Sequence, residues 1–182
     1  MNSIQASSRA ESSDHLEVRP HSESLSPFGP QMAAEIMVKT VGQMFDSFPE
    51  NRASEATILA FSDALKNLPH ELLRHSVAKA IIHETFTPKV TTILRYAALA
   101  SLNLPSANDQ AEMAIKGIRR GRWEGIEIHG LARAAIKSLG GLRTAESLNE
   151  SETGNWLARF RKAFEAECES AVMSEMERLA GG

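Results

Sequence analysis

The chain has 182 residues, enough for one small domain or one and a half, with 42% hydrophobic and 24% charged residues as in ordinary globular proteins. Its formal net charge of −3 excludes nucleic-acid binding through overall charge, so any such role needs a local basic patch. Cys168 is the only cysteine, which excludes an internal disulfide and a zinc site made of several cysteines, and fits a cytoplasmic location. No apolar run approaches the ~20 residues of a membrane helix, so we expect no membrane contact.

Residues 1–29 are rich in serine and acidic groups and poor in apolar side chains. Such a segment cannot bury enough surface to offset the entropy lost on ordering, so we predict a disordered N-terminal tail. Two isolated apolar residues in the tail, Leu25 and Phe28, are candidates to dock on the helical body or on a partner.

Three helices are predicted between Pro30 and about Thr85. The first ends at Pro49, Ser54 is placed to cap the second, and Pro69 ends the second and opens the third. Apolar residues follow one face of the first helix at the spacing of a buried helix face. They are Met37, Val41, Met44, Phe45 and Phe48.

Two further helices are predicted after a short connector. Thr91 or Thr92 is expected to cap the fourth helix, which Pro105 ends. Ser106 or Asn108 then begins the fifth.

A sixth helix is predicted to end at the pair Gly140-Gly141, which suits a helix C-terminus. Asn149 and Glu152 resemble a capping box at the start of a long last helix. The apolar face of that helix consists of Trp156, Phe160, Phe164, Cys168, Ala171, Val172 and Leu179.

No segment alternates with a period of two between hairpin turns, so little strand is expected and we predict an all-α fold. Its predicted parts are the disordered tail over 1–29, an N-terminal helical domain over 30–104 and a C-terminal helical segment over 105–182. This last segment is first basic and then acidic, and it ends in the long helix.

The stretch PHELLRH (Pro69–His75) looks like an altered zinc-protease signature. Such proteases need two histidines four residues apart, so that both imidazoles reach one metal from one helical face. His70 and His75 are five apart, which separates them by roughly 140° around a helix. We therefore predict an ordinary helix there and no metal site.

Other catalytic patterns are also missing from the sequence. It has no GxSxG, no phosphate-binding glycine-rich loop followed by Lys and Ser or Thr, and no GxGxxG after a strand. Cys168 lies on the apolar face of the last helix, where core packing accounts for it. We predict a protein that is not an enzyme and uses no cofactor, with an enzyme site assembled from distant helices as a third possibility.

The densest basic stretch is KGIRRGRW, from Lys116 to Trp123. Cations beside an indole suit a single-stranded nucleic acid, because the cations follow the phosphates while the ring stacks on a base. The alternative is a solvated helix end whose basic residues favour the C-terminal dipole, with the indole in the core. The candidate nucleic-acid-binding residues are Lys116, Arg119, Arg120, Arg122 and Trp123.

The balance of charge reverses after Thr144, where glutamates outnumber basic residues. An acidic last helix with an aromatic face is expected to pack on its own body or on a second protein.

The alternative to the class of protein described below is a DNA-binding transcriptional regulator of the helix-turn-helix type. The Leu-Pro-His-Glu turn would join its two helices, and the second helix would enter the DNA groove. That helix offers few residues for base contacts, namely Arg74, His75, Lys79 and His83.

The run from Ile36 to Tyr96 has a particular order of features. A helix ends at Phe48-Pro49, the next ends at a Leu-Pro step within ALKNLPHELLRHSVAKAI, and FTPKVTTILRYA leads into the following helix. This order resembles the small helical phage proteins that load or inhibit the DnaB-type replicative helicase. The positions that match the entry to the last of these helices are Phe86, Pro88, Ile93 and Arg95.

The later run ARAAIKSLGGLRTAES followed by WLARFRKAFEAE resembles the second half of some of these proteins, in which a helix closes on Gly-Gly before an aromatic-rich helix. Leu142 stands where those proteins have an aromatic residue. The resemblance implies a non-enzymatic adaptor that binds the helicase and delivers it to an origin through an initiator protein or single-stranded DNA. It also implies that a mobile segment contacts the partner, with the tail over 1–29 and the last helix as candidates. The candidate partner-binding residues are Phe86, Pro88, Arg95, Trp156 and Phe160.

Overall fold

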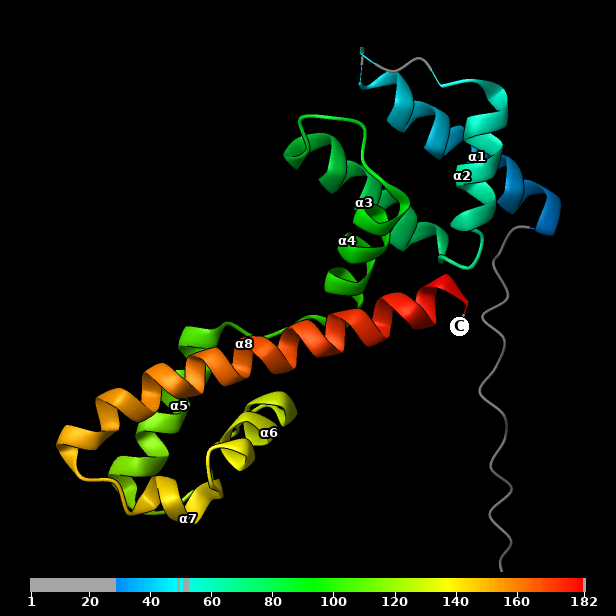
Figure 1. The fold of residues 1–182 in the computed structure, drawn as a ribbon. Coiled ribbons are helices and arrows are strands. Elements are labelled where there is room, and N and C mark those ends of the chain that lie inside the picture. The colour runs from blue at the N-terminus through cyan, green and yellow to red at the C-terminus, as the bar shows by residue number, and fades with distance from the viewer. Residues whose placement is uncertain (1–28, 49, 51–52, 182) are drawn as a thin grey trace, which may run out of the picture.

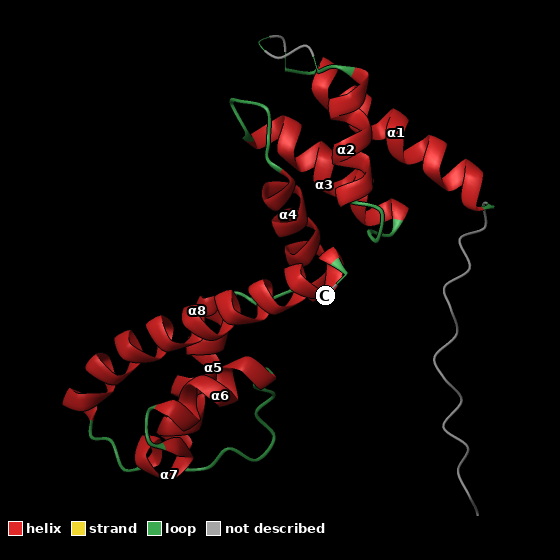
Figure 2. Cartoon of the chain, turned by 45° about the vertical axis from the view of Figure 1, so that its right-hand side comes forward, coloured by secondary structure: helices red, strands yellow, loops and turns green. Residues whose placement is uncertain are grey.

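The computed structural model describes residues 29–48, 50 and 53–181, and the predicted tail lies outside these ranges except for its last residue. Every regular element in the described ranges is a helix, which confirms the predicted all-α fold (Figures 1 and 2). The helices are α1 (Pro30–Asp46), α2 (Glu55–Ala64), α3 (His70–His83), α4 (Val90–Leu102), α5 (Ala107–Arg120), α6 (Gly130–Ser138), α7 (Gly141–Glu146) and α8 (Glu150–Ala180).

Two hydrophobic cores divide the molecule into two lobes that share α8 (Figure 1). The first lobe contains α1 to α4 and the C-terminal end of α8. The second lobe contains α5 to α7 and the N-terminal half of α8. Val172 and Leu179 of α8 are buried in the first core, so residues 30–104 do not close that core alone. The apolar face predicted for the last helix is therefore used in packing on its own body.

Side-chain caps mark the starts of four described helices, which are α2, α5, α6 and α8. The Ser54 side chain accepts a hydrogen bond from the Thr57 amide at 3.2 Å, as predicted, and Ser106 caps α5 in the same way. The predicted cap at Thr91 or Thr92 is wrong, because α4 begins at Val90. The Lys89 carbonyl already accepts the first hydrogen bonds of α4, so both threonines lie inside its first turn.

Two polar links join α4 to α8. The Arg95 guanidinium donates two hydrogen bonds to the Glu169 carboxylate, at 2.6 and 2.7 Å. Six residues further along α4, the Ser101 hydroxyl donates to Glu175 at 2.7 Å. These links fix the register of α8 on the first lobe.

The second lobe is built around the aromatic residues of α8. The rings of Trp156 and Phe160 stack at 5.5 Å between centroids, and Phe160 stacks on Phe164 at 6.1 Å. All three side chains are buried in the second core, where α8 packs mainly against α5 and α6. The predicted capping box at the start of α8 is confirmed, since Asn149 and Glu152 each accept a hydrogen bond from the other's backbone amide.

The connection between α6 and α8 contains a short helix that the sequence did not indicate. Gly140 and Gly141 have φ values of 102° and 83°, which favour glycine, and α6 does end just before them. The chain does not leave helical structure there, because the six-residue α7 begins at Gly141. Its Ala145 is buried in the second core, so packing stabilises a helix too short to be stable alone.

Candidate functional site

The basic stretch forms the end of α5 and the turn that follows it. Lys116, Arg119 and Arg120 lie exposed in the last turns of α5, and Arg122 lies exposed just beyond the left-handed Gly121. Across the part of the chain that the structure describes, none of these four cations forms an ion pair with a carboxylate. Their charges are therefore available to an external anion.

Trp123 is half-buried and lies against the helix that precedes it. A Cβ atom added at Gly117 would lie 2.7 Å from the indole Cδ2 and closer still to two other ring atoms. Only glycine at this position of α5 allows the ring to approach so closely. The indole nitrogen is buried and has no hydrogen-bond partner. A buried N–H without an acceptor is uncommon in folded proteins and costs about 1–3 kcal/mol.

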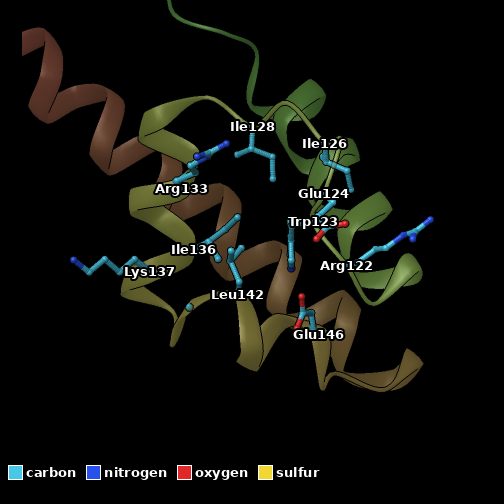
Figure 3. A pocket seen from close by; sticks show the side chains of 11 residues that line it. Arg122, Trp123, Glu124, Ile126, Ile128, Arg133, Ile136, Lys137, Leu142 and Glu146 are labelled. Carbon is cyan, nitrogen blue, oxygen red and sulfur yellow. The ribbon is translucent and has the colours of Figure 1, made fainter.

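A pocket of about 630 Å³ opens beside this indole (Figure 3). Trp123 forms one wall, and Ile136 of α6 and Leu142 of α7 lie on the opposite side in the view of Figure 3. The lining combines an apolar floor with charges of both signs. It consists of Arg122, Trp123, Glu124, Ile126, Ile128, Arg133, Ile136, Lys137, Gly141, Leu142 and Glu146.

The packing of the second lobe thus adds Arg133 and Lys137 to the predicted basic residues. Both lie on α6, four residues apart, and both line the pocket with Arg122. The sequence shows two signals for them: they belong to a stretch from Ala107 to Arg143 that has seven cations and four anions, and their spacing puts two cations on one helical face. It contains no signal that this face lies opposite Trp123.

A second candidate surface lies on the first lobe, at the end of α3. Ile82 is 72% exposed and Phe86 is 69% exposed, and Leu99 of α4 is also exposed. A groove of about 310 Å³ lies between the two helices, lined by His75, Lys79, His83, Tyr96, Leu99 and Ala100. We call Ile82, Phe86 and this groove the α3–α4 face. Figures 1 and 2 show the end of α3 at the edge of the first lobe, away from α2.

The candidate partner-binding residues are dispersed over the molecule. Phe86 is exposed, whereas Pro88 is buried where the connector enters α4. Trp156 and Phe160 are buried in the second core, so a partner reaches them only if the second lobe opens. Partner contact by these residues stays a prediction.

Arg95 is exposed, but its guanidinium is already engaged by Glu169. Their hydrogen bonds raise the pKa of Arg95 and lower the pKa of Glu169. A partner that binds Arg95 has to compete with this carboxylate, and the pair itself connects α4 to α8.

The helices proposed for a helix-turn-helix are α2 and α3. Arg74, His75, Lys79 and His83 are exposed on α3. Helix α2 packs mainly against α1 and helix α3 packs mainly against α4, whereas a helix-turn-helix packs its two helices together. A groove-reading role of α3 stays a prediction.

The two histidines of the altered zinc-protease signature differ in burial. His70 is half-buried with its Nε2 unpartnered, while His75 is exposed. Within residues 29–48, 50 and 53–181, no three His, Cys, Asp or Glu side chains are grouped so that they could hold a metal ion. Burial raises the pKa of the Cys168 thiol, and Glu165 and Glu167 raise it further. A protonated thiol is a poor nucleophile.

Over the same described residues, no helix has both the length and the apolar character that crossing a membrane requires. Comparisons with protein-family models, with curated proteins and with solved structures found no match to this chain.

Proposed function

We propose that this protein is a non-catalytic adaptor of DNA replication that binds a DnaB-type helicase and loads or regulates it. In this proposal the first lobe docks on the helicase through the α3–α4 face. The basic end of the second lobe binds single-stranded DNA, and an initiator protein is a further candidate partner. The site of action is the cytoplasm of a bacterium or of a phage-infected host. The observation that carries the proposal is the presence of two exposed surfaces of different chemistry on the two lobes.

The α3–α4 face supports the protein-binding part of the proposal. Ile82 and Phe86 leave most of their apolar surface in water, which is unfavourable unless a partner covers it. Phe86 is also one of the positions at which this sequence resembles helicase loaders. The adjacent groove carries His75, Lys79 and His83, so the face is apolar with a basic margin.

The basic end of α5 supports the DNA-binding part. Cations without carboxylate partners gain most from phosphates, because binding releases the counterions of the strand. The dipole of α5 also favours cations at this end of the helix. The dipole alone is therefore enough to explain the position of the cations, even in the absence of DNA binding. The dipole does not explain the pocket or the unpaired indole beside them.

Helix α8 supports the adaptor role. Its 31 residues span about 46 Å at the rise of an α-helix, and its two ends are buried in different cores. A helix anchored in this way keeps the two surfaces at a fixed distance, as a protein that brings a helicase to a strand requires.

The protein-binding part is tested with a purified DnaB-type hexamer in size-exclusion chromatography. The unmodified chain is expected to co-elute with the hexamer, and the double variant Ile82→Ser with Phe86→Ser to elute separately. Leu59→Ser is the matched control, because Leu59 is an exposed apolar residue on α2 outside the face. The proposal is wrong if the unmodified chain does not bind, or if the control and the double variant behave alike.

The DNA-binding part is tested by replacing Lys116, Arg119, Arg120 and Arg122 with Ala. We expect affinity for a single-stranded oligonucleotide to fall and the salt dependence of binding to flatten, since fewer counterions are released. Unchanged affinity and salt slope would show that these residues contact no nucleic acid.

A further inference from the structure

We propose that the pocket beside Trp123 holds one base of a single DNA strand, turned out from its neighbours and stacked on the indole. This inference rests on the proposed DNA-binding function and names the part of the strand that the second lobe binds. It assigns the pocket a ligand class, a stacking platform and a hydrogen-bond donor.

The shape of the pocket favours a flat ligand. One side of the indole is covered by α5 at Gly117, so a ligand has to approach from the pocket. Ile136 and Leu142 lie across from the ring, and their apolar side chains complete a slot (Figure 3). Bases bound by proteins are commonly held between an aromatic ring and apolar side chains, and stacking is strong for every base.

The polar groups of the pocket match the edge of a base. The Trp123 indole N–H is buried without an acceptor, and Glu146 lines the same pocket without accepting from it. Glu146 therefore offers an acceptor to a ligand, while the indole N–H, which has almost no accessible surface, meets one only after the ring or its neighbours shift. The pairing edge of every nucleobase carries an acceptor next to a donor, so a base that reaches both groups satisfies them without sequence preference.

The charges favour a strand over a free nucleotide. Arg122, Arg133 and Lys137 line the pocket with Glu124 and Glu146, so opposite charges largely offset one another there and a small anion gains little from the pocket alone. The unpaired cations at the end of α5 lie within six residues of Arg122 along the chain and are exposed. They offer positions for the phosphates of neighbouring nucleotides, which only a strand supplies.

The test uses Trp156→Phe as background, which leaves Trp123 as the single tryptophan of the chain. Titration with oligodeoxythymidine is expected to quench the Trp123 emission, since a base stacks on the ring. Added Trp123→Ala is expected to lower the affinity by roughly fivefold to a hundredfold, the range known for losing one stacked base. The salt slope should stay unchanged, because the phosphate contacts remain.

A second variant tests the pocket in case Trp123→Ala lowers the affinity only by disturbing the fold. Leu142→Ala removes the opposite wall at an exposed position and leaves the indole in place. It should weaken binding severalfold, whereas Leu59→Ala on the other lobe should have no effect. Thermal unfolding of each variant monitors the fold.

The outcomes separate this inference from the function on which it rests. Salt-dependent binding with unchanged Trp123 emission, and no effect of Trp123→Ala, would overturn the base site and leave DNA binding by the cations standing. Failure to bind any oligonucleotide would overturn both, while helicase binding is measured independently. If thymidine monophosphate binds as tightly as the oligonucleotide, the pocket is a nucleotide site and the inference is wrong.

Discussion

Protonation of Glu175 is expected to weaken the attachment of α8 to the first lobe. Its carboxylate accepts hydrogen bonds at 2.7 Å from the Ser101 hydroxyl of α4 and from Nε and Nη2 of Arg178. The Glu175 side chain is only 11% exposed. The Arg178 hydrogen bonds, helped by the Ser101 hydroxyl and the charge of Arg178, lower the pKa of Glu175 from its ordinary value of 4.5 to about 2.

The size of the effect follows from this difference in pKa. The whole difference between the two pKa values of Glu175 corresponds to about 3 kcal/mol in the free energy of unfolding. Arg178 is 65% exposed, so solvent screens the pair and we expect about 1–2 kcal/mol. Because the pKa is lower in the folded chain, folding is favoured while the carboxylate is ionised. The stabilisation is complete above about pH 4.5 and is lost as the pH falls toward 2.

The measurement is urea unfolding of the unmodified chain and of Glu175→Gln between pH 7 and pH 2.5. We expect Glu175→Gln to be less stable by about 1–2 kcal/mol at pH 7, with the difference shrinking toward low pH. Glu177→Gln, at an exposed neighbouring position of α8, is the control and should show no such trend. A difference between Glu175→Gln and the unmodified chain that is absent at pH 7, or constant with pH, would refute the reasoning.

Three further predictions concern the fold. Asn149→Ala removes one half of the capping box and should lower the free energy of unfolding by about 1 kcal/mol in thermal denaturation; an unchanged melting temperature would contradict the capping role. Gly117→Ala should gain about 1 kcal/mol through helix propensity but lose more because the new methyl group displaces the Trp123 ring. We expect the free energy of unfolding to fall by about 1–2 kcal/mol in total and the Trp emission to change. A stabilised variant would contradict this reasoning. Deleting residues 1–29 should leave the melting temperature nearly unaltered, and a large drop would show that they belong to the fold.

The sequence predicts the helix starts well where the signal is local. Ser54, Ser106 and Asn149 each accept a backbone hydrogen bond within three residues, so the residue type at one position decides the outcome. The sequence does not predict a helix whose formation depends on tertiary packing. The helix α7 is too short to show periodicity and follows two glycines, so its formation depends on the burial of Ala145, which no local pattern reveals.

The candidate site is predictable only in the part that is contiguous in the sequence. The basic residues from Lys116 to Trp123 are contiguous, so their position at one helix end follows from the sequence alone. The pocket does not follow from it, because α6 brings Arg133 and Lys137 to its lining through tertiary packing. The contact of Trp123 with Gly117 crosses the end of α5 and also has no helical spacing to indicate it.

The burial of α8 restricts where partners can bind. The last helix was a candidate for partner contact, and its aromatic face is the part of it best suited to that role. That face is already buried, with Phe160 and Phe164 in the second core and Val172 in the first. A partner gains little by displacing it, since opening either core exposes several large apolar side chains. Binding energy is therefore expected from surfaces that folding leaves uncovered, which are the α3–α4 face on one lobe and the Trp123 pocket on the other.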